Sequence, residues 1–401
     1  MQTGGVHRAR AVPRTVWVLG CVSLLTDLSS EIVHSLLPIF LTSVLGVSAF
    51  GVGFIEGVAE ATASITKLFS GAVSDCVGRR KGLVLVGYGL SALTKPIFAL
   101  AGSVPWVLTA RFADRVGKGI RGAPRDALVA DVTPPPVRGA AFGLRQSFDT
   151  VGACVGPLVA MGLMALTGGA FRLAFWIATI PAAGAVFLIL TAVQEPAVHR
   201  ASGNAVRFRR TDLVHLGPGF WGAVGVATLM TLARCSEAFL ILRAGTVGLA
   251  GTWAPVVLVV MNVVYAGVAY PVGRLSDRIG RQGLLGAGFA ALLAAEVVLA
   301  LAGSVGAVLL GSGLWGLHLG MTQGLLATRV AESVPGTLRG TAFGVFNLLT
   351  GSALFAASAL AGALWSACGP AATFGAGAVL SGLALLALSV FVSRWPAASS
   401  S

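Results

Sequence analysis

The chain has 401 residues, of which 56% are hydrophobic and only 11% are charged, and its mean hydropathy is +0.86. A soluble protein carries roughly a quarter of its residues as Asp, Glu, Lys and Arg, so this composition excludes a water-soluble globular protein and requires apolar surface to face lipid. The net charge of +13 does not point to nucleic acid, because the basic residues lie at the ends of apolar segments, where anionic lipid attracts them.

Apolar segments of about 20 residues, enough to cross a hydrocarbon core as a helix, recur along the whole chain. We read about twelve of them, at 15–41, 50–71, 82–102, 105–130, 139–167, 171–194, 216–242, 250–271, 283–302, 305–331, 339–366 and 370–393. The first continues apolar with no small-residue cleavage pattern, so we expect a retained helix and not a signal peptide. The sequence thus predicts an all-α integral membrane protein that has a lipid bilayer around it.

Basic residues mark the N-terminus and the end of every even-numbered segment, from Arg14 to Arg394. The loops on the opposite side have only Arg172 and Arg243. Because basic residues near helix ends stay on the cytoplasmic side, we expect a multi-pass protein of a bacterial-type inner membrane with both termini in the cytoplasm.

The first two segments carry charges at bilayer depth, where each costs roughly 2.5–3.5 kcal/mol and faces the protein interior or a watery cavity. Asp27, Glu31 and His34 are four and three residues apart, so they share one face of the first helix. Glu56 and Glu60 share a face of the second helix in the same way. We expect these residues to line a substrate cavity.

Two sequence elements occur twice in the chain. GAVSDCVGRRK, which starts at Gly71, returns as GRLSDRIGRQG at Gly273, and PPPVRGAAFG at Pro134 returns as PGTLRGTAFG at Pro335. The repeat predicts two six-helix halves, 1–194 and 215–401, joined by a cytoplasmic linker at 195–214. A duplicated helical unit with its site between the repeats is typical of transporters.

The first of these elements resembles the signature loop of the major facilitator superfamily, and its copy lies where that family has a second copy. The matching residues form a candidate gating loop: Gly71, Asp75, Gly78, Arg79 and Arg80 in the first half, and Asp277 and Arg281 in the second. The resemblance implies twelve helices in two pseudo-symmetric halves, and a loop that stabilises one access state. A carboxylate and a guanidinium at a helix end can lock two bundles in one arrangement. The alternative, simple anchorage of the helix ends, explains the arginines but not the glycines or Asp75.

In that superfamily the third, sixth, ninth and twelfth helices are outer supports. Here the sixth and twelfth have no charge in their interiors, the third has only Lys95 and the ninth only Glu296. Lys95, like Lys67 of the second helix, lies nearer a helix end, and we expect both lysines to extend toward the membrane surface.

The fourth segment has a broad polar side made of five charged residues, Arg111, Asp114, Arg115, Lys118 and Arg121. Arg115-x-x-Lys118-Gly119 resembles the R-x-x-Q-G pattern of the family, whose arginine is implicated in proton handling in proton-coupled members. Lys118 replaces the glutamine, so an anion-binding stripe is the competing interpretation.

The fifth segment indicates the direction of transport. Gly143, Gly152, Gly156 and Pro157 have the spacing that resembles the pattern of proton-driven exporters in the superfamily, although Ala160–Met161 replaces its final glycine pair. Small residues allow close helix approach, and a proline bends the helix. Ordinary glycine-rich packing is the alternative.

The same segment carries Arg145 and Asp149 one helical turn apart. Aligning the two halves places Phe346 and Thr350 at the equivalent positions of the second half, so the fold alone does not require these charges. We therefore expect the functional charges in the first half. The alternative is that they pair with one another as buried ion pairs.

The second half contributes few polar residues to the expected cavity: Arg234, Glu237 and His318. The five cysteines are scattered without C-x-x-C spacing, so we expect no metal site. No G-x-x-x-x-G-K-[ST] run is present, so we expect neither an enzyme nor an ATP-driven pump, and no cofactor apart from a proton gradient.

Together these patterns predict a monomeric secondary transporter that exports a small organic molecule in exchange for protons. Asp27 and Glu31 are the candidate proton carriers, because two close carboxylates in a drying cavity cannot easily both ionise. Arg115 would tune them, and the coupling role passes to Asp149 or Asp114 if both acids prove structural. Two alternatives stay open. One is a proton-coupled importer or exchanger of an anionic metabolite, which the basic residues of the fourth segment favour. The other is a membrane sensor that transports nothing.

Overall fold

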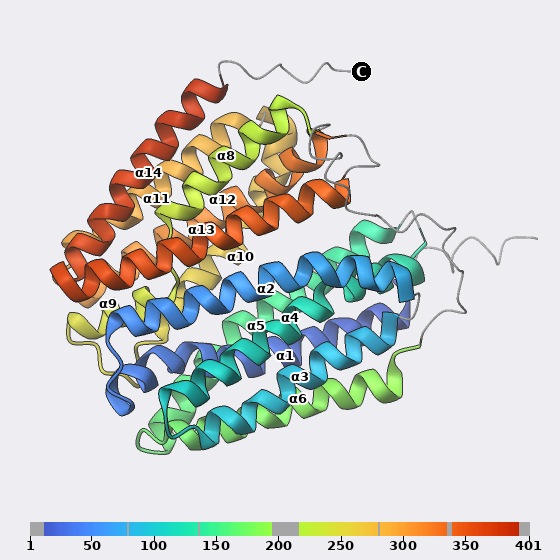
Figure 1. Ribbon diagram of the computed structural model, residues 1–401, viewed down its shortest axis with the longest axis horizontal. Helices are drawn as coiled ribbons and strands as arrows, with labels where there is room; N and C mark the ends of the chain where they lie inside the picture. The colour runs from blue at the N-terminus through green and yellow to red at the C-terminus, as the bar shows by residue number, and fades with distance from the viewer. Residues whose placement is uncertain are drawn as a thin grey trace, which may run out of the picture. The chain divides into compact units, whose positions relative to one another are not determined.

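The computed structural model describes residues 12–77, 80–134, 137–194, 216–279, 281–334 and 339–392, and within these ranges the chain is helical with no strand (Figure 1). The first half forms α1 (Arg14–Ile39), a π-helical turn η2 (Phe40–Val44), α2 (Ala49–Val77), α3 (Arg80–Leu100), α4 (Val104–Val132), α5 (Arg138–Leu166) and α6 (Phe171–Ala192). The second half forms α8 (Pro218–Ala233), α9 (Ala238–Thr246), α10 (Val256–Ile279), α11 (Arg281–Leu301), α12 (Val305–Glu332), α13 (Arg339–Cys368) and α14 (Pro370–Val392). The predicted all-α membrane fold is confirmed.

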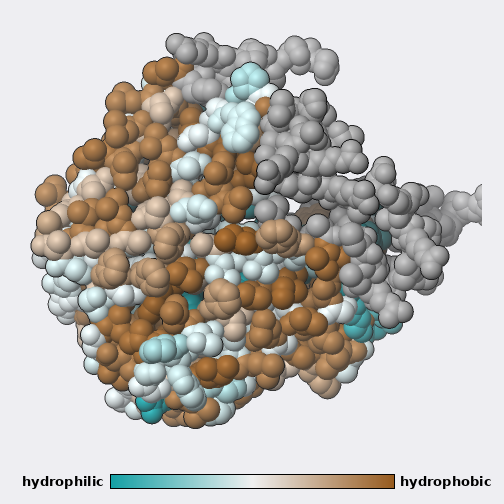
Figure 2. Space-filling view, in the orientation of Figure 1, coloured by the Kyte–Doolittle hydropathy of each residue, from teal (hydrophilic) through white to brown (hydrophobic). Residues whose placement is uncertain are grey.

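Ten helical spans within the described residues are long and apolar enough to cross a membrane. The two long helices outside that set, α2 and α4, have 29 residues each and carry several of the charges that the sequence placed at bilayer depth. Large apolar side chains are exposed on the spans, such as Leu166 at 87% and Leu301 at 81%, and apolar residues cover much of the face in Figure 2. In water such a surface would be strongly unfavourable, so it faces lipid.

Packing divides the chain into two units. Unit 1 contains Met1–Leu45 and Thr62–Arg207, and unit 2 contains Gly46–Ala61 and Phe208–Ser401. The two units use equivalent helix pairs. In unit 1, α1 lies against α5 and α6, and α3 against α4 and α6; in unit 2, α8 lies against α13 and α14, and α11 against α12 and α14. This correspondence agrees with the sequence repeat.

The boundary between the units falls inside α2. Its first half packs on α13, where a Cβ added to Gly57 would lie 2.9 Å from the Phe355 ring and one added to Gly53 would collide with the backbone oxygen of Ser358. Its second half packs on α4, where Ser70 Oγ donates to the Gly119 carbonyl at 2.8 Å. The division of α2 was not predicted, and the predicted linker 195–214 lies outside the described residues.

The seventh predicted segment, 216–242, is present as a candidate membrane span over Pro218–Thr246. Its helix is interrupted, because α8 ends at Ala233 and α9 begins at Ala238, and this interruption was not predicted. The residues between them include Ser236, whose Oγ accepts a hydrogen bond from the Ala238 N–H at 3.3 Å and thereby supports the start of α9. Hydropathy measures only the length of an apolar segment, and the segment LARCSEAF has no glycine or proline to indicate a break.

The two arginines on the sparsely charged side of the membrane cap helix ends. Arg172 donates to the carbonyl of Ala101 at 3.3 Å, just beyond α3. Arg243 donates to the carbonyl of Leu299 at 2.9 Å and to that of Ala302, at the end of α11. A cation near the C-terminus of a helix satisfies free carbonyls and complements the helix dipole, which accounts for both exceptions to the charge asymmetry.

Candidate functional site

In unit 1, the acidic face of α1 packs directly on glycines of α5. A Cβ added to Gly152 would lie 2.9 Å from Cβ of Asp27, and one added to Gly156 would collide with Cβ of Glu31. Nothing lies within 4 Å of a Cβ added to Gly143. Two of the three motif glycines therefore permit the close approach of α1 and α5, and they do so at the two acids that the sequence singled out.

The side chain of Asp27 is half-buried. Charged groups lie around it, but none of the described ones is its direct hydrogen-bond or ion-pair partner. Within the part of the chain that the structure describes, no hydrogen bond or ion pair reaches its carboxylate. The charges that act on it come from α5 and α4, namely Asp149, Arg121, Lys118 and Arg125. One turn along α1, Glu31 Oε2 lies 3.5 Å from Nδ1 of the buried His34. The two candidate proton carriers thus differ, since only Glu31 has a direct partner.

The third and fourth helices are joined by a buried ion pair. Lys95 Nζ lies 3.0 Å from Asp114 Oδ1, and the two side chains are 1% and 5% exposed. Lys95 also donates to Ser30 Oγ of α1 at 3.3 Å. The prediction that Lys95 extends to the membrane surface was wrong, because an acid of α4 lies opposite it and stabilises its charge in the interior. Lys67, for which the same was expected, is exposed.

Arg121 is held against α3. Its guanidinium donates to Ser91 Oγ at 2.6 Å and lies 4.7 Å from the centre of the Tyr88 ring. This arrangement combines a charge-assisted hydrogen bond with a cation–π contact. On the same helix, Arg111 and Arg115 are buried, with 2% and 5% exposed, whereas Lys118 is exposed.

Arg125 connects four helices, and the sequence interpretation did not include it in the site. It donates to Ser23 of α1 at 3.1 Å, to Tyr88 of α3 at 3.4 Å and to Asp126 of α4 at 3.2 Å, and it lies 3.9 Å from Asp149 of α5. Residue spacing could have identified Arg125, because it lies four residues after Arg121 and therefore on the same polar side of α4.

The charges of α5 are paired within the helix and with α4. Arg145 Nη1 donates to Asp149 Oδ2 at 2.6 Å, and Arg145 Nε lies 3.7 Å from Asp126 Oδ1. The structure therefore supports buried pairing for Asp114, Arg145 and Asp149, the alternative that the sequence left open. Their assignment to substrate or proton binding stays a prediction.

Unit 2 brings together a second polar group. Glu56 and Glu60 of α2 are buried and half-buried, and the charges of Glu237 and Glu60 act on Arg234 at the break between α8 and α9. The buried His318 of α12 places Nδ1 2.8 Å from the carbonyl of Gly288. The residues that the sequence assigned to the cavity in this unit therefore come from three places. α2 contributes Glu56 and Glu60, the break between α8 and α9 contributes Arg234 and Glu237, and α12 contributes His318.

Most of the candidate gating loop cannot be placed. Gly71 lies in α2, whereas Gly78 and Arg79 lie outside the described residues, as do the side chains of Asp75, Asp277 and Arg281. Arg80 starts α3, and its Nη1 lies 2.8 Å from Asp131 Oδ2 near the end of α4. Within the described residues, no group of three or more His, Cys, Asp or Glu could hold a metal ion.

Comparisons with known proteins agree with this architecture. The sequence model of the Major Facilitator Superfamily matches residues 19–358. An uncharacterised MFS-type transporter of Methanocaldococcus jannaschii is 30% identical over 388 residues, 94% of this chain and 95% of that protein. The multidrug resistance protein MdtH of Photorhabdus laumondii is 34% identical over 143 residues, 35% of each chain. Among solved structures, the nucleoside transporter NupG has a similar fold, with a TM-score of 0.75 and 12% identity over 95% of this chain and 99% of that one.

Proposed function

Because the chain belongs to the Major Facilitator Superfamily, we propose that this transporter exports a small organic molecule in exchange for protons. The observation that carries the proposal is the contact of Asp27 and Glu31 with Gly152 and Gly156. It joins the exporter-type glycines of α5 to the candidate proton carriers of α1. Similarity to a multidrug resistance protein over about a third of the chain supports the same direction.

Asp27 is the acid best suited to carry the proton. Asp114 and Asp149 are held by Lys95 and Arg145, so a proton that binds either of them must displace a cation. Asp27 has no such partner among the described residues, so protonation changes its charge without breaking an ion pair. A charge at this depth is expensive, and its neutralisation therefore biases the equilibrium between access states.

The same contact explains how a proton can act on helix packing. α1 and α5 approach closely at Asp27, so the charge of that side chain acts on both helices and on the basic residues of α4. A proton and a substrate that prefer opposite access states exclude one another by linkage, and this exclusion produces exchange. No step requires a nucleotide or a metal.

Transport in inverted membrane vesicles tests the proposal. A resistance screen in a pump-deficient host first identifies a transported compound. Vesicles with an acidic lumen should then accumulate that compound, and a protonophore should abolish accumulation. Accumulation that survives the protonophore would exclude proton coupling, and the absence of flux for every compound would favour the membrane sensor.

Import or exchange of an anionic metabolite is the second candidate. It is favoured by the buried Arg111 and Arg115 and the exposed Lys118, which lie on successive turns of α4. This function requires uptake that rises with an inward proton gradient. Measuring both directions in the same vesicles separates the two candidates.

A further inference from the structure

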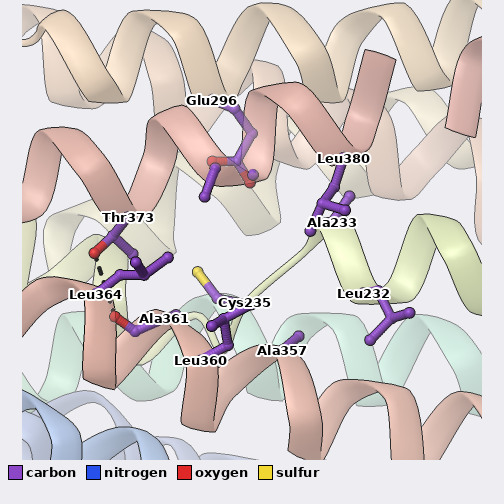
Figure 3. A pocket seen from close by; sticks show the side chains of 12 residues that line it. Leu232, Ala233, Cys235, Glu296, Ala357, Leu360, Ala361, Leu364, Thr373 and Leu380 are labelled. Atoms are coloured by element: carbon purple, nitrogen blue, oxygen red, sulfur yellow. Dashed lines mark hydrogen bonds between the residues drawn. The ribbon is translucent and has the colours of Figure 1, made fainter. Parts of the chain in front are cut away.

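One buried acid of unit 2 lies outside the groups described above. Glu296, five residues before the end of α11, is 1% exposed. It lines a cavity of about 20 Å³ whose other walls come from the end of α8, from Cys235 in the break between α8 and α9, and from α13 and α14. Figure 3 shows the Glu296 side chain on one side of this space and the sulfur of Cys235, from the break, directed toward it from the other.

The packing of α14 leaves room for this carboxyl group. A Cβ added to Gly377 would lie 2.6 Å from both Cδ and Oε2 of Glu296. An alanine at that position would therefore collide with the acid. α11 and α14 pack against each other, so the glycine and the glutamate together form a built pocket in a part of the fold that otherwise serves as support.

The carboxyl group has no partner in this pocket. Among the residues that the structure describes, neither of its oxygens has a hydrogen-bond partner and no cation pairs with it. α13 contributes Ala357, Leu360, Ala361 and Leu364, and α14 contributes Thr373, Ala376, Gly377 and Leu380, none of which is charged. The Thr373 hydroxyl is already directed to the carbonyls of Ala361 and Gly369. Cys235 is the one other titratable group in the described lining, and Arg234 precedes it in the chain.

These surroundings suit a neutral acid and not a carboxylate. An ionised group without a partner in an apolar interior is very costly, and such a group takes up a proton instead. The cavity has room for about one water molecule, which excludes an organic substrate. A metal cation would need several oxygen ligands, whereas the lining offers little beyond the carboxyl group itself.

We propose that Glu296 is a proton-binding site of unit 2, which holds its proton while α11, α14 and the α8–α9 break pack as they do here. Cys235 lines the cavity and adjoins Arg234, so a movement of the break changes the walls around the acid. Opening the cavity to water releases the proton, and closing it requires the proton to return. The proposal is independent of the direction of transport and of the acids of unit 1.

Infrared difference spectroscopy of the full-length protein in lipid nanodiscs tests it, with H₂O/D₂O exchange to identify carboxyl bands. The spectra are recorded at neutral pH in potassium buffer. Subtracting the spectrum of Glu296→Gln from that of the wild type should leave the carbonyl band of one protonated acid. Glu296→Asp should keep an acid band at a shifted frequency, and Cys235→Ser should leave the band in place. The matched control is Asp114→Asn, which should remove a carboxylate signal and not an acid signal.

Two results with Glu296→Gln would overturn the proposal: loss of a carboxylate band, or no change in either the acid band or the carboxylate band. Loss of the wild-type acid band when sodium replaces potassium would also overturn it, because that result would assign the site to a metal cation. If Glu296→Gln does not fold, Gly377→Ala provides the second variant. Its added methyl group should shift the same acid band, and an unchanged spectrum would show that the protonated group lies elsewhere.

Discussion

At the scale of single residues, the acids of this protein fall into two kinds that their spacing in the sequence does not distinguish. Asp114 and Asp149 are held by cations, at 3.0 and 2.6 Å, whereas Asp27 and Glu296 have no direct partner among the described residues. An acid in an ion pair stabilises the packing of its helices, and an unpaired acid is available to exchange a proton. Neutralising the two kinds should therefore have different consequences.

Lys95→Met tests the structural kind. Lys95 is the direct ion-pair partner of Asp114, and breaking a buried ion pair costs about 3–5 kcal/mol, so the thermal transition temperature of the purified protein should fall clearly. The double variant Lys95→Met/Asp114→Leu removes both charges and should recover much of the loss. Equal stability of the single and double variants would show that the loss of Lys95 does not destabilise the protein through the charge of Asp114.

Asp27→Asn and Asp149→Asn compare the two kinds directly. Asp27→Asn should leave stability within about 1 kcal/mol, because it breaks no hydrogen bond, and should abolish gradient-driven export while exchange of substrate without a gradient persists. Asp149→Asn should cost about 1.5–3 kcal/mol, the value of a hydrogen bond to a charged group. Wild-type, pH-dependent export by Asp27→Asn would transfer the coupling role to another acid.

At the scale of helices, the glycines decide which elements can touch. Gly152 and Gly156 are buried against α1, and Gly53 and Gly57 against α13, so the backbones approach at points where any side chain would separate them. The break between α8 and α9 acts in the opposite way, because it ends one helix inside the membrane and leaves polar residues there.

Gly156→Ala is the test at this scale, and Gly143→Ala is its matched control on the same helix. The added methyl group collides with Cβ of Glu31 at position 156 and meets nothing within 4 Å at position 143. Overpacking of this kind costs about 1–3 kcal/mol, so Gly156→Ala should lower both the melting temperature and the transport rate, and Gly143→Ala should change neither. Equal effects of the two variants would mean that the motif acts through helix flexibility and not through contact.

At the scale of the whole molecule, the two units repeat one pattern of helix pairs but differ in charge. In unit 1 the charges of α3, α4 and α5 are joined through Lys95, Arg125 and Arg145, and Arg125 also donates to Ser23 of α1. In unit 2, Trp315 occupies the position that corresponds to Asp114, and it is completely buried. The duplicated fold therefore needs no charges at these positions, and we expect coupling to reside mainly in unit 1, with Glu296 as a separate site.

The predicted orientation can be tested with reporter fusions. Both termini are expected in the cytoplasm, because basic residues concentrate on that side. Green fluorescent protein fused after Ser401 should fluoresce, and alkaline phosphatase should be active when fused after Gly168 and inactive when fused after Val137. The reverse pattern would place the arginine-rich ends outside the cell and overturn the assignment of the loops.

Much of the fold could be predicted from the chain alone. The predicted spans agree with the helices to within a few residues at most ends, since an apolar segment of about 20 residues must be a helix in lipid. The site was predicted less well. Residue spacing located the polar face of α1 and left the pairing of Arg145 with Asp149 open as the alternative to a functional role. It missed Arg125 and misjudged Lys95, because both depend on groups supplied by other helices.

The sequence by itself determined the membrane class, the helix count, the repeat and the family, because these depend on local hydropathy and on residues close together in the chain. Only the tertiary structure decided which acids are paired, that α2 is divided between the units, that the seventh span is broken, and that Glu296 faces Gly377 in a pocket of its own. The physical reason is that the free energy of a buried charge depends on what other helices place within a few ångströms of it. Hydropathy and spacing along one helix contain no information about that distance.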